Sequence, residues 1–160
     1  MKARLVESIE IFDNKVHEKL VHHRLSYTDQ FFAAITGLGS MYMSIIIFSV
    51  LYFVKPGFMW LLLPKFVILT SLVFVLKEIF NRDKPEDSPL TIDLTKSFPS
   101  GHSAVSVFMA VSFSSLMPEL SVLMYVVASL VCISRVYLGA HYPTDVLAGS
   151  TLGALTALLL

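Results

Sequence analysis

Long apolar stretches, broken by short groups of charged residues, prolines and glycines, dominate the chain from residue 27 onward. A membrane-spanning helix needs about 20 mostly apolar residues. Five segments approach that length, and they run from about Phe31 to Val54, Phe58 to Phe80, Pro99 to Pro118, Leu120 to Val136 and Pro143 to Leu160. Lys55-Pro56-Gly57 separates the first two, and Pro64 falls near the start of the second, where proline is tolerated. The pattern predicts an all-α, polytopic membrane bundle of about five transmembrane helices.

The order of these segments also predicts where their polar ends meet. The polar stretch 81–96 contains two prolines and reads as a loop, and the last apolar segment ends at Leu160 without a polar flank, as either a natural end or a shortened chain would. If consecutive spans alternate in direction, the reactive side chains gather on one membrane face. That set comprises Lys77, Arg82, Lys84, Ser100, His102, Arg135, His141 and Asp145.

The first 26 residues have a different pattern. Apolar residues recur every three to four positions among many charges, at Leu5, Ile9, Phe12, Val16 and Leu20. This spacing is typical of one face of an amphipathic helix, and the charges argue against a cleaved signal peptide. We expect the helix to lie along the membrane surface; packing on the protein's own polar cap is an equally good interpretation. The chain then forms one membrane-embedded domain over residues 1–160, with an interfacial helix (1–26) and a transmembrane core (27–160).

Composition supports a membrane protein. Hydrophobic residues make up 55% of the chain and charged residues 15%, whereas about a quarter of the residues of soluble proteins are charged. The formal net charge is zero, which gives no bulk attraction to nucleic acid. The single cysteine, Cys132, excludes an internal disulfide and a multi-cysteine zinc site.

A first candidate for chemistry lies at the start of the third span, in Pro99-Ser100-Gly101-His102. Proline suits the first helical turn, Ser100 can cap the helix, and Gly101 allows a ligand to approach the backbone. The free N–H groups of such a turn bind anions, and His102 adds a titratable imidazole. An ordinary capped helix start with an interfacial histidine is the alternative interpretation.

A second candidate joins the fourth and fifth spans. Arg135 ends the fourth, His141 follows, and Asp145 comes four residues later, where its carboxylate can orient the imidazole. A divalent metal site is the alternative, but it ranks lower because the cationic Lys77, Lys84 and Arg135 would repel a metal and attract a phosphate.

Lys77, Arg82 and Lys84 form a third group at the end of the second span. Lysine and arginine at such positions often extend their charged ends to the membrane surface. This interpretation is favoured for Arg82, whereas Lys77 lies deepest in the apolar segment and is favoured as a functional residue.

Together these residues resemble the type 2 phosphatidic-acid-phosphatase superfamily, whose pattern is Lys-x6-Arg-Pro, Pro-Ser-Gly-His and Ser-Arg-x5-His-x3-Asp. The second and third motifs are intact, as Pro99 to His102 and Ser134 to Asp145. The first departs from the pattern because Lys84 stands where the family usually has arginine. Lysine keeps the charge but lacks the planar fork that binds two oxygens at once.

The resemblance implies a metal-independent lipid phosphatase without cofactors. It assigns His141 as the nucleophile, Asp145 as its orienting acid and His102 as the proton donor. It assigns phosphoryl binding to Lys77, Lys84, Arg135, Ser100 and the Gly101 amide, with Arg82 as an additional candidate.

The expected partners are the bilayer and a lipid phosphate, namely undecaprenyl diphosphate, phosphatidylglycerol phosphate or phosphatidic acid; the oligomeric state is left open. A phosphotransferase with the same phosphohistidine and a non-catalytic phosphate-binding module are the alternative functions. Loop charges favour a cytoplasmic site, but they are themselves the proposed ligands. The resemblance favours an extracytoplasmic site in a bacterial-type inner membrane.

Overall fold

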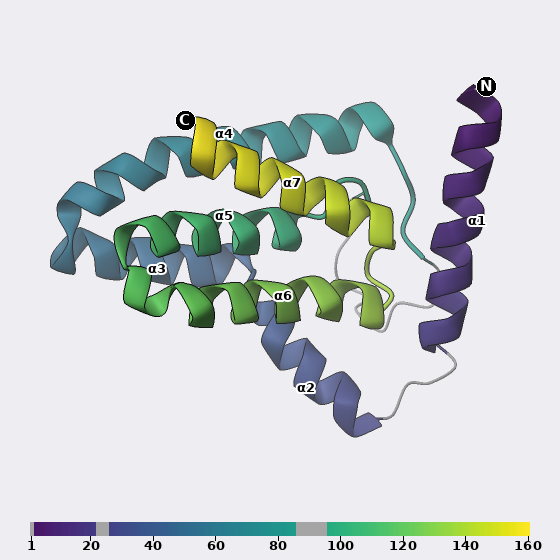
Figure 1. Cartoon of the computed structure of the whole chain (residues 1–160), viewed down its shortest axis with the longest axis horizontal. Coiled ribbons are helices and arrows are strands. Elements are labelled where there is room, and N and C mark those ends of the chain that lie inside the picture. The colour runs from purple at the N-terminus through teal and green to yellow at the C-terminus, as the bar shows by residue number, and fades with distance from the viewer. Residues whose placement is uncertain (1, 22–25, 86–95) are drawn as a thin grey trace.

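The computed structural model describes residues 2–21, 26–85 and 96–160, and every regular element within them is helical (Figure 1). The elements are α1 (Lys2–Val21), α2 (Ser26–Gly37), α3 (Met41–Val54), α4 (Pro56–Phe80), α5 (Gly101–Leu116), the short 3₁₀ turn η1 (Pro118–Leu120), α6 (Ser121–Tyr137) and α7 (Pro143–Leu159). The predicted all-α class is confirmed. The predicted loop 81–96 is described only at residues 81–85 and 96, which are not helical.

The bundle is built around α5, which packs against α4, α6 and α7 (Figure 1). Most of α5 is buried, and Ala104 and Phe108 are fully enclosed. Leu69 of α4 and Val131 of α6 are buried to the same degree. A helix enclosed in this way contacts protein instead of lipid along most of its length.

The contact between α5 and α7 depends on two glycines. A Cβ atom at Gly149 would collide with the backbone of Ser100, and one at Gly153 would lie 3.0 Å from the backbone nitrogen of Phe108. Small residues four positions apart allow the backbones of neighbouring membrane helices to approach closely. The two glycines therefore seat α7 directly against the start of α5.

The first predicted span is not one continuous helix. It is divided into α2 and α3, whose axes differ by 44°. The Ser40 side chain accepts a hydrogen bond from the N–H of Met43 at 3.2 Å and so caps a new helix. Gly39 is needed at the break because a Cβ atom there would lie 2.7 Å from Val131 Cγ1. The prediction of an unbroken helix from Phe31 to Val54 was wrong because it treated 37–40 as ordinary apolar sequence.

By length and composition, the structure also has fewer candidate membrane spans than the five that the sequence predicted. In the described part of the chain, two helices are long and apolar enough to cross a membrane, the segments Pro56–Phe80 and Pro118–Tyr137, and the bent pair α2–α3 makes three. The remaining two predicted spans became α5 and α7, with only 16 and 17 residues. Pro64 lies inside α4, because that helix already begins at Pro56.

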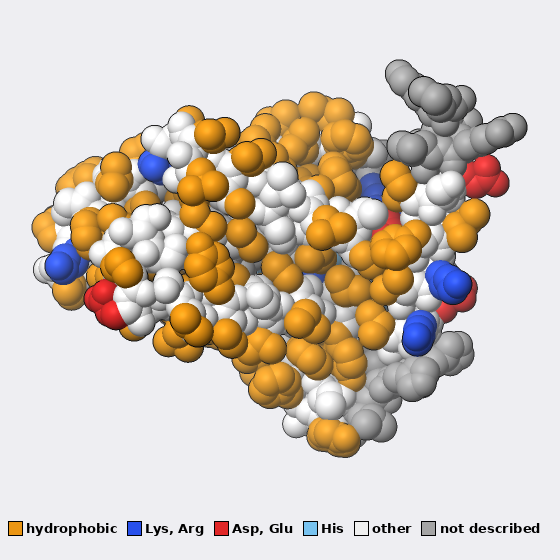
Figure 2. All heavy atoms as spheres, in the orientation of Figure 1, with side chains coloured by type: hydrophobic (Ala, Val, Ile, Leu, Met, Phe, Trp, Pro, Cys, Tyr) orange, Lys and Arg blue, Asp and Glu red, His pale blue; other side chains and the backbone are white. Residues whose placement is uncertain are grey.

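The surface agrees with a membrane protein. On the face shown in Figure 2, hydrophobic side chains cover most of the bundle, and lysine, arginine and acidic side chains gather toward its two ends. Trp60, Phe74 and Val122 are among the large apolar side chains exposed on α4 and α6. An apolar surface of this extent is expected to face lipid.

The N-terminal helix α1 runs across the end of the bundle, and it contacts α6 and α7 (Figure 1). Its polar residues Asp13 and His17 face inward and are buried, whereas Ile11 and Phe12 are more than half exposed. The helix thus packs on the polar cap of the protein, as the second interpretation of the sequence predicts, whereas its position along the membrane surface stays a prediction. It ends at Val21, and residues 22–25 of the predicted segment lie outside the described residues.

Candidate active site

The end of the bundle beside α1 holds the predicted site residues, because α4 and α6 end there and α5 and α7 begin there (Figure 1). A pocket of about 270 Å³ opens between α3, α4 and α5. Its described lining is formed by Gly39, Met41, Leu69, Thr70, Val73, Phe74, Lys77, Gly101, His102, Val105 and His141. Four residues from the three motifs, Lys77, Gly101, His102 and His141, therefore meet at one end of a largely apolar pocket.

The Pro-Ser-Gly-His segment forms the capped helix start that its sequence predicts. Ser100 is fully buried and is the N-cap of α5, with its Oγ accepting hydrogen bonds from the N–H and the hydroxyl of Ser103. The nearest heavy atom to a Cβ built on Gly101 would be Val73 Cγ1 at 3.7 Å, so this part of the backbone is open toward the pocket. Ser100 thus lies behind the pocket as a helix cap, whereas Gly101 and His102 line it.

His141 is fixed by the turn that follows α6. The carbonyl oxygen of Arg135 accepts the N–H groups of Ala140 at 3.0 Å and His141 at 3.2 Å. The turn passes through Gly139 at a φ of 64°, where glycine avoids the steric penalty of other residues. The ring of His141 is only 2% exposed, and it borders the pocket.

Asp145 lies behind His141, as predicted, but a third residue takes part. The distance from His141 Nδ1 to Asp145 Oδ2 is 3.8 Å, which is long for a hydrogen bond. The hydroxyl of Ser97 donates to Asp145 Oδ2 at 2.5 Å and lies 3.4 Å from His141 Nδ1. Nδ1 therefore faces a carboxylate and a hydroxyl, and Nε2 is the ring nitrogen left for substrate.

The surroundings of His141 favour the neutral imidazole. The pKa of His141 is lowered from the usual 6.5 to about 4: burial is the largest cause, the nearby charges of Arg135 and Lys77 add to it, and Asp145 opposes the shift. A neutral imidazole has a free lone pair at neutral pH, as a nucleophile requires.

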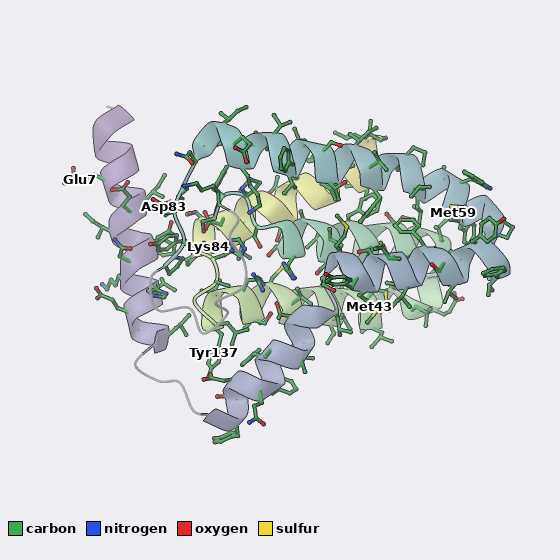
Figure 3. All side chains as sticks on the ribbon, turned by 180° about the vertical axis from the view of Figure 1, so that it is seen from behind. Glu7, Met43, Met59, Asp83, Lys84 and Tyr137 are labelled. Carbon is green, nitrogen blue, oxygen red and sulfur yellow. The ribbon has the colours of Figure 1, made fainter. Side chains whose placement is uncertain are left out.

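Of the motif residues Lys77, Lys84 and Arg135, Lys77 alone lines the pocket. Lys77 lines the pocket, and its ammonium group also donates to the carbonyl oxygen of Lys96. Arg135 is buried, and it donates to Thr36 Oγ1 of α2 at 2.9 Å. Lys84 is half-buried at the same end of the bundle and does not line the pocket (Figure 3).

Arg82 does not lie where a phosphate ligand or an interfacial side chain was predicted. It donates to Asp145 Oδ1 at 2.8 Å and to Asp13 Oδ2 at 2.7 Å, and its guanidinium stacks 4.2 Å from the centre of the Tyr142 ring. Burial disfavours its charge, but the two carboxylates outweigh that effect and raise its pKa. Arg82 is thus turned away from the pocket toward the back of Asp145.

The alternative of a metal site receives no support from the donor set. Within the described ranges, no cluster of three or more His, Cys, Asp or Glu side chains could hold an ion. Both oxygens of Asp145 already accept hydrogen bonds, from Arg82, Ser97 and the backbone N–H of Tyr142.

Sequence reasoning assigned no role to three residues that contact these side chains: Asp13, Ser97 and Thr36. Ser97 stands two positions before the Pro-Ser-Gly-His motif, a proximity that could have marked it. Asp13 and Thr36 carried no signal, because their contacts depend on how α1 and α2 fold back onto the bundle.

Comparison with known proteins agrees with this geometry. Residues 58–160 match the PAP2 superfamily, and the chain belongs to this superfamily, which includes metal-independent membrane lipid phosphate phosphatases. The crystal structure of a transmembrane PAP2-type phosphatidylglycerolphosphate phosphatase from Bacillus subtilis superposes with a TM-score of 0.84 at 30% identity, covering 95% of this chain and 84% of that one. The structure of LpxE from Aquifex aeolicus has the same fold, with a TM-score of 0.80 at 24% identity, and the match covers 92% of this chain and 93% of that chain.

Two relatives are more similar over shorter stretches. Phosphatidylglycerophosphatase B of Bacillus subtilis is 44% identical over 92 residues, which cover 51% of this chain and 45% of that protein. Lipid A 1-phosphatase of Rhizobium johnstonii is 46% identical over 65 residues, which cover 40% of this chain and 26% of the relative. The chain therefore spans less than half the length of these relatives.

Proposed function

We propose that this protein is an integral-membrane lipid phosphatase that hydrolyses a lipid phosphomonoester or diphosphate through a phosphohistidine on His141. The observation that carries the proposal is the pocket with two histidines and Lys77 at one end and apolar residues along the rest. A phosphate group fits the charged end, because Lys77 and the first N–H groups of α5 attract anions there. A lipid tail fits the apolar walls formed by Leu69, Val73 and Phe74.

The first step is attack of His141 Nε2 on phosphorus. An N–P bond forms as the bond from phosphorus to the lipid oxygen breaks, and His102 gives its proton to that departing oxygen. Asp145 and Ser97 hold the opposite nitrogen, Nδ1, and stabilise the positive charge that develops on the ring. Lys77 and the Gly101 amide stabilise the negative phosphoryl oxygens, a contribution that usually dominates phosphoryl transfer.

The second step releases phosphate. His102, now neutral, removes a proton from a water molecule that attacks phosphorus, and the N–P bond to His141 breaks. Arg135 and Lys84 supply further positive charge at this end of the bundle, and we propose that Lys84 reaches the phosphate once substrate is bound. Ser100 acts in both steps through the helix start that it caps.

The relatives and the pocket together support a choice among the candidate substrates. The names of the similar proteins refer to phosphatidylglycerophosphate and to the 1-phosphate of lipid A. Phosphatidylglycerol phosphate is therefore the first candidate for this chain, ahead of undecaprenyl diphosphate and phosphatidic acid. The partner implied in every case is a lipid that stays in the bilayer while its headgroup enters the pocket.

The test is phosphate release by detergent-purified protein in EDTA, with these lipids and lipid A 1-phosphate as a panel. The His141→Ala variant should lower release by at least about 10³-fold, and one lipid should be preferred. A variant with unchanged release would overturn the assignment of His141. Transfer of phosphate to another lipid without free phosphate would instead indicate a phosphotransferase, and tight phosphate binding without turnover a binding module.

We further propose that the site faces the extracytoplasmic side of a bacterial-type inner membrane. Because α7 leads from the site toward the opposite end of the bundle, its C-terminus should then be cytoplasmic (Figure 1). A reporter fused after Leu160 that is active only in the cytoplasm should give a signal. A signal from a reporter active only outside the cytoplasm would reverse this orientation.

A further inference from the structure

We propose that Asp13, on the N-terminal helix α1, is a positioning residue for the reaction, because it holds Arg82 and the start of α7 in the arrangement that fixes Asp145 behind His141. The proposal rests on the proposed phosphohistidine function. It assigns the N-terminal helix a part in catalysis, although α1 lies outside all three sequence motifs.

Asp13 is fully buried, which is unusual for a carboxylate unless it is paired. Its Oδ1 accepts the backbone N–H of Thr144 at 3.2 Å, and its Oδ2 accepts the Thr144 hydroxyl at 2.5 Å. Thr144 lies in the first turn of α7, where N–H groups lack partners within the helix. Asp13 therefore caps α7 from a different helix and brings a negative charge to its positive end.

Arg82 connects this cap to the catalytic carboxylate. Its Nη2 donates to Asp13 Oδ2 at 2.7 Å, and its Nη1 donates to Asp145 Oδ1 at 2.8 Å and to Thr144 Oγ1 at 2.9 Å. Both carboxylates are fully buried and the guanidinium is a quarter exposed. One cation thus fixes the distance between a carboxylate from α1 and a carboxylate from α7.

The second oxygen of Asp145, Oδ2, is the one that faces the His141 ring. Oδ2 accepts the Ser97 hydroxyl and the N–H of Tyr142, and it faces His141 Nδ1. With Oδ1 held by Arg82, the carboxylate cannot rotate without breaking a charged hydrogen bond. The orientation of the imidazole therefore depends on a chain of contacts that begins at Asp13.

The loss of Asp13 should act on the rate rather than on substrate binding. Asp13→Asn removes the charge that holds Arg82 Nη2 and places an amide near other donors. Lys77, Gly101 and His102 line the pocket together with His141, whereas Asp13 does not line it. We expect kcat to fall by about 10- to 100-fold, the range found for outer residues that orient metal-binding side chains in a comparable way, with KM nearly unchanged.

The experiment compares Asp13→Asn, Asp13→Glu and Glu10→Gln in the full chain. Glu10 is exposed on the same helix, so Glu10→Gln removes the same charge without touching the network and should keep the wild-type kcat. Asp13→Glu should recover part of the lost rate because it restores a carboxylate. In Arg82→Ala protein, adding Asp13→Asn should have little further effect on kcat, since the chain is already broken.

A second measurement does not depend on turnover. The nitrogen chemical shifts of ¹⁵N-labelled histidine, assigned with His141→Gln, report which ring nitrogen of His141 carries the proton. Wild-type protein should hold the proton on Nδ1, and Asp13→Asn should shift the ring toward a mixture of both forms. If no lipid is hydrolysed, the proposed function fails while this measurement still decides on the positioning role. An unchanged tautomer, or an Asp13→Asn variant that loses thermal stability with wild-type kcat, would overturn the proposal.

Discussion

A single methyl group added at Gly149 should separate α7 from the start of α5 at Ser100. In Gly149→Ala the new Cβ would lie 3.2 Å from the carbonyl carbon and 3.3 Å from the backbone nitrogen of Ser100, with the Ser100 oxygen closer still. These atoms belong to the backbone of a buried N-cap, so no side-chain rotation can relieve the collision. Either α7 or the Pro-Ser-Gly-His segment must move.

The expected loss of folding stability in Gly149→Ala follows from the rigidity of that backbone contact. Overpacking a filled interior costs about 1–3 kcal/mol, and we expect about 3 kcal/mol here because the obstacle is backbone. For a chain of this size each kcal/mol lowers the melting temperature by about 2–4 °C, so Gly149→Ala should melt about 6–12 °C below wild type. Activity should also fall, because the N–H of Ser100 donates to the Asp145 carbonyl at 3.0 Å and this contact would be displaced.

The assay is thermal unfolding in one detergent at one heating rate, with phosphate release measured at a temperature where every variant is folded. Gly57→Ala is the matched control, since a Cβ at that position of α4 meets nothing within 4 Å. It should melt within a few degrees of wild type. A Gly149→Ala protein that melts like the control and keeps full activity would refute the close packing of α5 against α7.

Three further predictions concern the pH dependence of activity and of stability, and the role of Lys84. Because the pKa of His141 is lowered to about 4, the neutral nucleophile should persist as pH falls, so kcat/KM should stay high to about pH 5. The two-histidine mechanism also needs a protonated donor, so kcat/KM should decline at alkaline pH, and a flat profile from about pH 5 to 9 would contradict it. The same lowered pKa means that the unfolded chain binds the proton first, so stability should decrease as pH falls from 6.5 toward 4. Lys84→Arg restores the planar fork of the family pattern and should raise kcat/KM by about 2- to 10-fold, mainly through KM, whereas Lys84→Gln should lower it; equal rates for lysine, arginine and glutamine would exclude Lys84 from phosphate binding.

The sequence predicted the elements of the fold better than their breaks. Apolar length is a direct consequence of bilayer thickness, so α4 and α6 were located to within a few residues. The break between α2 and α3 was missed because its cause, the close contact of Gly39 with Val131, arises only when α2 packs against the bundle. The short α5 was predicted to span the membrane because its sequence is apolar. Its apolar residues instead pack against α4, α6 and α7, and this packing cannot be read from local sequence.

In the site, too, local sequence predicted the motif residues, whereas long-range contacts were not predicted. Motif spacing predicted that His102, His141 and Lys77 would meet, and all three line one pocket. The interpretation of Arg82 failed because its partner Asp13 lies 69 positions away on a helix whose polar face could equally have pointed to water. Local sequence identifies the residue types that chemistry needs, but long-range ion pairs depend on the folded arrangement of α1 and α7.

The most direct test of the account is to trap the phosphoenzyme. Purified protein would be mixed with phosphatidylglycerol phosphate carrying a labelled terminal phosphate, quenched in alkaline denaturant, digested and analysed by mass spectrometry. The account predicts an alkali-stable, acid-labile phosphate on the peptide that contains His141, and its loss in His141→Ala. Turnover without any phosphate on His141, or label on another residue, would contradict the proposed mechanism.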